Sequence, residues 1–127
     1  MNRKALLLIP ALTLLGMAAA LPAQTAPRPD GAMLFRQRCA SCHNMTPGAR
    51  SVLAPSLIGV VGRKAASTAF NYSPALKASN LTWTRANLDR YLSGPTRMVP
   101  GTRMVIAISD AAQRAAVLDF IARPPAR

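Results

Sequence analysis

The sequence predicts an all-α fold of about four helices joined by long loops. Helix-capping residues recur along the chain, often followed by proline or by apolar residues at helical spacing. No stretch shows the sustained alternation of apolar and polar residues that a half-buried strand requires. The segment from Asn44 to Asn71 is rich in proline and glycine and too long for a loop in an empty small domain. We therefore expect the chain to wrap around a bound group.

Length and charge narrow the function classes. The chain has 127 residues, enough for one domain with its own core. Sixteen Lys and Arg residues stand against four acidic residues, all of them Asp, which gives a formal net charge of +12. No basic run is interleaved with aromatic residues, as a single-strand nucleic-acid surface would require. The sequence therefore predicts a basic protein that does not bind nucleic acid.

The N-terminal residues are typical of an export signal. Residues 2–4 include a positive Arg-Lys pair, residues 5–20 are almost unbroken apolar sequence, and small residues follow up to Ala20 and Ala23. We expect cleavage after one of these two alanines. The predicted organisation is a signal peptide over 1–23, a short linker over 24–30 and one folded domain over 31–127.

An uncleaved membrane anchor is the alternative for the same segment. About seventeen apolar residues is the lower limit for a spanning helix. Pro10 and Pro22 interrupt the stretch, which favours a cleaved signal. Both interpretations place the domain outside the cytoplasm, in the periplasm.

The first helix is predicted to begin after Asp30, a suitable N-cap that follows Pro29. It carries Leu34 and Phe35 inward. We expect this helix to continue into the stretch CASCH, Cys39 to His43.

CASCH contains both cysteines and the single histidine of the chain. In an exported protein a disulfide between Cys39 and Cys42 is the simplest interpretation. A thioredoxin-like redox pair would need a βαβ context that the sequence lacks. Structural zinc would need a fourth ligand, and Cys39, Cys42 and His43 supply three.

C-x-x-C-H is the pattern of covalent haem attachment. On a helix, residues i, i+3 and i+4 share one face, so Cys39, Cys42 and His43 would point the same way. Two sulfurs could then hold the porphyrin edge while the imidazole reaches the iron. The pattern predicts one haem c attached through Cys39 and Cys42.

A sixth iron ligand would come from methionine, because no second histidine exists. Two of the six methionines belong to the export segment, Met33 lies on the first helix, and Met45 is too close to His43. Met98 and Met104 remain, separated by a Pro-Gly turn. We prefer Met104 and keep Met98 as the alternative.

Two further helices are expected in the middle of the chain. Ser73 followed by Pro74 predicts a short helix through about Ala78. A second helix over 84–93 would have an apolar face and end at Gly94-Pro95. Its inward residues are Leu88, Tyr91 and Leu92.

The last helix is predicted to start at Ser109-Asp110. Ala112, Ala116 and Phe120 repeat every fourth residue along it. We expect these small alanines to let the last helix cross close to Gly31 on the first.

Over residues 31–122 the chain resembles class I cytochrome c, the small monohaem electron carriers. The resemblance rests on several motifs in order. They are GAMLF, CASCH, APSLIGVVGRKA, FNYS with Tyr72, Trp83, RYLSGP, VPGTRM ending at Met104, and VLDFIA.

The resemblance implies the cytochrome c fold, with His43 and Met104 as axial ligands of the iron. It also implies that the carbonyl of Pro55 accepts a hydrogen bond from the His43 ring, which fixes the ring and its basicity. Such a protein transfers single electrons and is not an enzyme, because both axial positions are taken.

The same resemblance implies roles for a polar set around the haem propionates. Arg63, Tyr72 and Trp83 would bind or neutralise one propionate, and Thr102 would assist the other, because a buried carboxylate without partners is costly. The chain departs from the family at Leu76, where many members carry Asn.

The implied partners are acidic redox proteins: an oxidase, a reductase or a dehydrogenase. Complementary charge speeds their encounter. The candidate steering residues are Arg36, Arg38, Lys64, Arg97 and Arg103. We expect a monomer. The basic charge of the chain is also compatible with association with a membrane surface.

Two alternatives to a general carrier stay open. One is a dedicated electron-transfer subunit of a single periplasmic dehydrogenase or oxidase. The other is a ligand-binding or sensor cytochrome with a labile distal site. A dihaem peroxidase would need a second C-x-x-C-H, which the sequence lacks.

Overall fold

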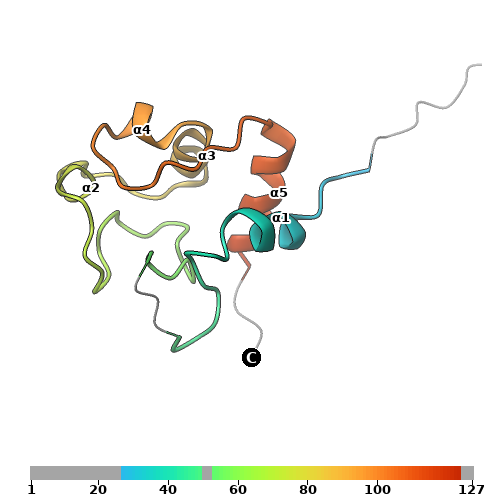
Figure 1. Ribbon diagram of the computed structural model, residues 1–127, viewed down its shortest axis with the longest axis horizontal. Helices are drawn as coiled ribbons and strands as arrows, with labels where there is room; N and C mark the ends of the chain where they lie inside the picture. The colour runs from blue at the N-terminus through green and yellow to red at the C-terminus, as the bar shows by residue number, and fades with distance from the viewer. Residues whose placement is uncertain (1–26, 50–52, 124–127) are drawn as a thin grey trace, which may run out of the picture.

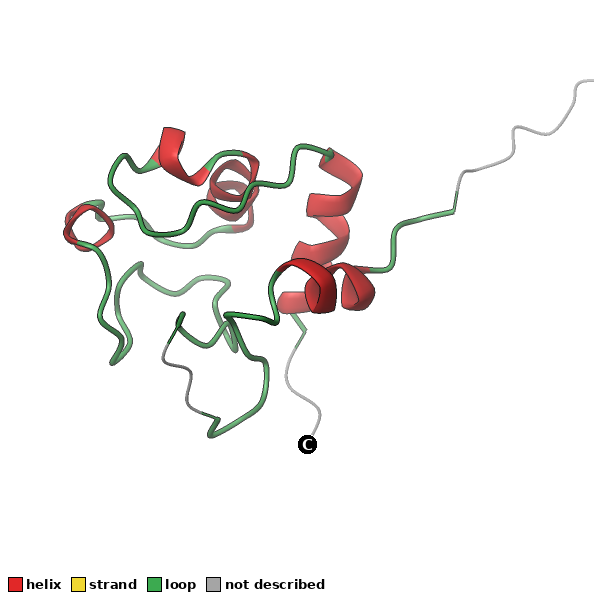
Figure 2. Cartoon of the chain, in the orientation of Figure 1, coloured by secondary structure: helices red, strands yellow, loops and turns green. Residues whose placement is uncertain are grey.

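The computed structural model describes residues 27–49 and 53–123, and the predicted signal peptide over 1–23 lies outside them. Within these ranges the regular elements are helices, shown in chain order in Figure 1 and against the loops in Figure 2. The all-α prediction is confirmed. The helices are α1 (Gly31–Arg38), α2 (Pro74–Ala78), α3 (Arg85–Ser93), α4 (Pro95–Met98) and α5 (Ala111–Ile121).

Helices α1 and α5 cross closely, as Figure 1 shows. Asp30 caps α1, its carboxylate accepting from the backbone N–H groups of Ala32 at 2.9 Å and Met33 at 3.2 Å. The crossing at Gly31 is confirmed, with Ala116 as its neighbour on α5. Ala112 is exposed, and the α5 atoms nearest Gly31 belong to Ala116 and Phe120 instead.

Helix α1 ends before CASCH, so the expected continuous helix is wrong. Arg38 is its last residue and Cys39 is the C-cap, with φ −121° and ψ −37°. The chain then forms a single hydrogen-bonded turn, in which the His43 N–H donates to the Cys39 carbonyl at 2.8 Å. This bond keeps the i→i−4 spacing of a helix for one turn only.

The two middle helices begin within one residue of their predicted starts, α2 at Pro74 and α3 at Arg85. The Ser73 hydroxyl accepts from Leu76 N at 3.2 Å, and the Thr84 hydroxyl accepts from Asn87 N at 3.1 Å. Gly94 ends α3 as expected, but Pro95 at once opens the four-residue α4, which was not among the expected helices. Proline suits the first helical position because its missing N–H has no acceptor there.

The core lies between α1, α3 and α5. Two aromatic pairs define it, Phe35 with Phe120 at 5.1 Å between centroids and Trp83 with Tyr91 at 4.9 Å. The expected inward face of α3 is confirmed, while Leu34 on α1 is only half-buried. The buried aliphatic residues around these pairs include Val60, Leu88, Leu92, Val99, Ile108, Val117, Leu118 and Ile121.

The long loop before α2 folds back on the segment that leads into α3. The backbone of residues 62–65 pairs antiparallel with that of residues 81–83, including Trp83 N to Arg63 O at 2.8 Å and Ala65 N to Leu81 O at 2.8 Å. The loop is therefore tied to the helical core. Over residues 27–49 and 53–123, the structure contains no helix with the length and hydropathy needed to cross a membrane.

Candidate functional site

The CASCH turn brings three donor groups onto one turn of backbone. Cys42 N and His43 N both bond the Cys39 carbonyl, at 3.0 and 2.8 Å. No disulfide joins Cys39 to Cys42. Cys39 is half-buried, and burial raises the pKa of its thiol while the neighbouring Arg38 charge lowers it. The Cys42 sulfur is more exposed and lies 3.7 Å from the Ser41 hydroxyl.

The His43 ring is held by the loop that follows. Its Nδ1 lies 2.8 Å from the carbonyl oxygen of Pro55, in a half-buried position. A carbonyl only accepts, so Nδ1 carries the proton and Nε2 keeps its lone pair. Burial lowers the pKa of the imidazole, while the Pro55 bond raises it. A neutral imidazole with a fixed tautomer is the form that binds a metal ion.

A second contact clamps the same two segments together. The backbone carbonyl of Asn44 accepts from Leu57 N at 3.1 Å and from the Ser56 hydroxyl at 3.4 Å. The residue after His43 is thus tied to the two residues after Pro55, next to the ring contact. Asn44 was not among the predicted site residues, because an isolated polar residue in a loop gives no periodic signal.

Arg63 is fixed by the loop that carries it. Its guanidinium donates to the carbonyls of Ile58 at 2.9 Å and Ser56 at 3.0 Å. The antiparallel pairing places its backbone beside that of Trp83, whose side chain is buried. Of the four predicted propionate partners, these two are therefore neighbours.

Tyr72 lies apart from that pair in the hydrogen-bond network. It is buried, and its hydroxyl is paired with the Thr68 hydroxyl. Its ring packs edge-on against Phe70, with 5.2 Å between centroids. Tyr72 is thus held by its own loop.

Thr102 is connected to Trp83 through a residue that the sequence analysis did not assign to the site. The Thr102 and Tyr91 hydroxyl oxygens lie 2.5 Å apart, and both side chains are buried. The Tyr91 ring packs against Trp83. A buried tyrosine hydroxyl normally needs a polar partner, and that rule was the available signal for Tyr91.

The loop that carries Met104 is anchored immediately before this residue. Thr102 is fixed by Tyr91, and the Arg103 guanidinium donates to the Asn71 carbonyl at 2.5 Å. Gly101 has φ +88°, a left-handed conformation that favours glycine and makes the turn after Pro100. Met104 itself is half-buried against the core.

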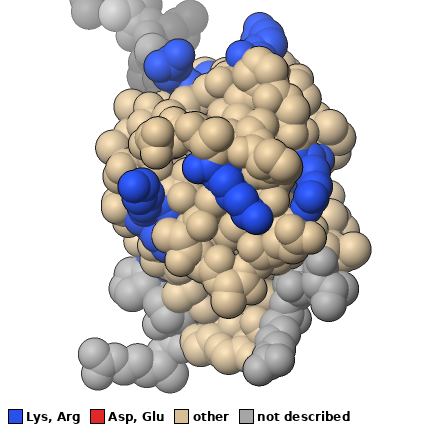
Figure 3. Space-filling view, turned by 90° about the vertical axis from the view of Figure 1, so that its left-hand side faces the viewer, with Lys and Arg blue, Asp and Glu red and all other residues tan. Residues whose placement is uncertain are grey.

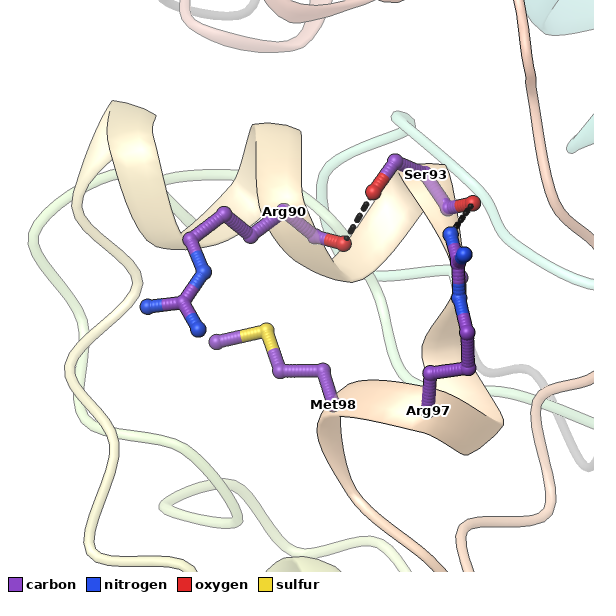
Figure 4. Close-up of a pocket in the computed structure, with 5 residues that line it drawn as sticks. Arg90, Ser93, Arg97 and Met98 are labelled. Atoms are coloured by element: carbon purple, nitrogen blue, oxygen red, sulfur yellow. Dashed lines mark hydrogen bonds between the residues drawn. The ribbon is translucent and has the colours of Figure 1, made fainter.

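Met98 occupies a different setting. It is half-buried on α4 and lines a shallow pocket with Arg90, Gly94 and Arg97, shown in Figure 4.

Charge is distributed unevenly over the site and the helices. Asp30 and Asp110 cap α1 and α5. Asp89 and Asp119 pair with Arg114 and Arg85 at 2.8 and 2.6 Å. The sequence has no other acidic residue, so residues 31–88 and 90–109 contain none. Figure 3 shows a face of the molecule on which Lys and Arg are visible and Asp is not.

These residues fit a covalently attached haem. Two thiols stand on one turn, and the His43 ring presents Nε2 because Nδ1 is bound to Pro55. The half-buried apolar side chains beside the core are of the kind that covers a porphyrin. They include Leu57, Leu76, Leu81, Met98 and Met104.

Comparison with known proteins supports the same assignment. The cytochrome c family model matches residues 29–123. Cytochrome c2 of Rhodomicrobium vannielii is 45% identical over 94 residues, which cover 72% of this chain and 74% of that protein. Cytochrome c2 of Rhodoblastus acidophilus is 44% identical over 77 residues, covering 60% of this chain and 72% of the relative.

A solved structure shares the fold. Cytochrome cH from Methylobacterium extorquens superposes with a TM-score of 0.66 at 37% sequence identity, covering 72% of this chain and 92% of that one.

Proposed function

The chain belongs to the cytochrome c family as a class I monohaem member, and we propose that it is an exported electron carrier whose iron is bound by His43 and Met104. Its haem c is attached through Cys39 and Cys42. When bound, the haem supplies a one-electron iron couple. The protein's part is to fix the ligands, exclude water and present the site to partners.

The observation that carries the proposal is the His43–Pro55 contact on the CASCH turn. With Nδ1–H donated to the Pro55 carbonyl at 2.8 Å, only Nε2 is left to bind iron. The hydrogen bond also orients the ring before any ligand arrives, so less ordering is required on binding.

Two anchors support Met104 over Met98 as the distal ligand. The Tyr91–Thr102 hydrogen bond and the Arg103–Asn71 hydrogen bond hold the backbone directly before Met104. Met98, in contrast, lies among arginines in the pocket between α3 and α4. A thioether held on an anchored loop can stay bound while the iron changes charge, which is what a carrier needs.

Absorption spectra of haem-loaded variants test this ligand set. Oxidised wild-type protein should show the weak charge-transfer band of a methionine–iron bond. Met104→Ala should lose the band, and Met98→Ala, the matched thioether control, should keep it. The reverse pattern would make Met98 the ligand. Rapid carbon monoxide binding to the reduced wild-type protein would instead favour a sensor with a labile distal site.

We also propose that the partners are acidic redox proteins. The reason is that residues 31–88 and 90–109 contain no acidic residue, so every formally charged side chain in these ranges is positive. Electron transfer to an acidic acceptor should then slow steeply as salt rises, because screening weakens steering. A rate that is flat between low and high ionic strength would exclude steering.

Export is tested by mass. Protein recovered from the periplasm should begin after Ala20 or Ala23 and carry the added mass of one haem. Full-length protein that stays in the membrane fraction would support the uncleaved anchor.

A further inference from the structure

The guanidinium of Arg63 is bound beside the group that orients the His43 ring. Its Nη1 donates to the Ile58 carbonyl at 2.9 Å, and its Nη2 donates to the Ser56 carbonyl at 3.0 Å. Ser56 directly follows Pro55, whose carbonyl accepts from His43 Nδ1 at 2.8 Å. The Arg63 side chain therefore holds the peptide unit next to the one that binds the imidazole.

The backbone of Arg63 is fixed to the segment that leads into α3. Its carbonyl accepts from Trp83 N at 2.8 Å, and its own N–H donates to the Val60 carbonyl at 3.1 Å. The Trp83 and Val60 side chains are both buried in the core. The Arg63 side chain thus reaches from backbone that is tied to the core back to the loop that carries Pro55.

The two carbonyls that Arg63 binds depend on it for a donor. In the part of the chain that the structure describes, no backbone N–H bonds the carbonyl of Ser56 or that of Ile58. Both residues are half-buried, and a carbonyl withdrawn from water needs a hydrogen-bond donor. The planar guanidinium supplies one from each terminal nitrogen, whereas a lysine would keep the charge without this fixed fork.

We propose that Arg63 is a positioning residue for the His43 ligand. Its two carbonyl bonds fix the loop so that the Pro55 carbonyl stays within hydrogen-bonding distance of Nδ1. That hydrogen bond sets the orientation and basicity of the imidazole. This inference rests on the proposed function, because it takes His43 as an iron ligand. Arginine has five N–H donors and these bonds use two, so donors remain for the propionate role that the resemblance implies.

The test measures the His43 Nδ1–H directly by NMR in the haem-loaded, reduced protein, which is diamagnetic. His43 is the single histidine of the chain, so labelling histidine nitrogen identifies its signal. Arg63→Lys should let the Nδ1–H exchange with solvent about tenfold faster, the change expected when about one net hydrogen bond is lost. Its proton signal should also move upfield, as for a weaker hydrogen bond. An unchanged exchange rate and signal position would overturn the proposal.

Arg114→Lys is the matched control for a general loss of stability. Arg114 is also a half-buried arginine that bonds two backbone carbonyls, those of Ile108 at 3.0 Å and Ser109 at 2.7 Å. The backbone N–H of Leu118, a buried residue of α5, is the internal reference for global opening.

The comparison is between the acceleration of the His43 Nδ1–H and that of the reference N–H. In Arg63→Lys the His43 proton should be accelerated more than the Leu118 proton. In Arg114→Lys it should be accelerated no more than the reference, and its signal should stay in place. Equal acceleration of the two protons in Arg63→Lys would mean that Arg63 acts only on global stability, which would exclude a positioning role.

The same spectra separate this inference from the proposed ligand set. An imidazole bound to the iron lies against the haem, so the ring current should shift its carbon-bound protons far upfield in the wild-type protein. Unshifted ring protons would reject His43 as the ligand, and the role of Arg63 would fall with it. Shifted ring protons together with an unchanged Nδ1–H in Arg63→Lys would reject the role of Arg63 alone.

Discussion

Gly31 on α1 lies so close to Ala116 on α5 that a Cβ atom on Gly31 would overlap the Ala116 carbonyl. Such a Cβ would lie 2.7 Å from the carbonyl carbon and 3.2 Å from the Phe120 Cβ. Backbone atoms cannot yield as a flexible side chain can, so the two helices would have to separate. The pair sets the distance at which α1 and α5 cross.

Gly31→Ala should destabilise the haem-loaded protein by about 1–3 kcal/mol through this overpacking. The sign of the stability change separates the two effects, because alanine stabilises a helix by about 1 kcal/mol when it replaces a glycine that has free space around it. Denaturant unfolding followed by circular dichroism measures the difference. A stabilised variant would show that the crossing can relax at no cost.

Local chemistry explains which helices could be predicted. Asp30, Ser73, Thr84 and Asp110 each accept from a backbone N–H at the start of a helix. Capping needs only a few neighbouring residues, so it is visible in sequence. Helix α4 escaped prediction because its four residues offer no period, and α1 was extended too far because its end depends on the C-cap conformation of Cys39.

The contacts of the candidate site also differ in whether they could be predicted from sequence. The His43–Pro55 hydrogen bond was expected from a resemblance and is present in the structure, although its role toward iron stays a prediction. The Tyr91–Thr102 pair joins residues eleven positions apart. Such contacts are set by tertiary packing, which no local pattern encodes.

The Tyr91–Thr102 hydrogen bond should contribute measurably to stability. Tyr91→Phe and Thr102→Val each leave one buried hydroxyl without its partner, so each should cost about 1–2 kcal/mol. The double variant should cost less than the sum, with a coupling of about 1 kcal/mol. Unfolding free energies of the four proteins give the cycle. Strict additivity would mean that the two hydroxyls do not interact.

Alkaline pH provides a separate test of Tyr91. Burial raises the pKa of its phenol above the ordinary 10.0, although the Thr102 hydrogen bond lowers it. The unfolded chain then loses this proton first, so stability falls as pH rises above the ordinary value toward the folded one. Tyr91→Phe should show a shallower loss over that range. Parallel curves for both proteins would place the alkaline loss in other groups.

Two ion pairs join α3 to α5 and should differ in strength. Arg85 and Asp119 are both well exposed, at 50% and 61% of their side-chain surface. Arg114 is only 12% exposed against 43% for Asp89. Arg114 also donates to the carbonyls of Ile108 at 3.0 Å and Ser109 at 2.7 Å. Asp89 therefore holds an arginine that ties down the chain before α5.

Asp89→Asn should cost about 1 kcal/mol or more, and Asp119→Asn less than about 0.5 kcal/mol, because exposed pairs lose most of their attraction to water and salt. Both changes remove one negative charge from a helix, so each is the control for the other. Thermal unfolding at low and high salt separates them. The Asp119 effect should vanish at high salt while part of the Asp89 effect persists, since the Arg114 carbonyl contacts lose their orienting partner in either buffer. Equal costs at both salt concentrations would mean that the half-buried arginine adds nothing beyond a surface pair.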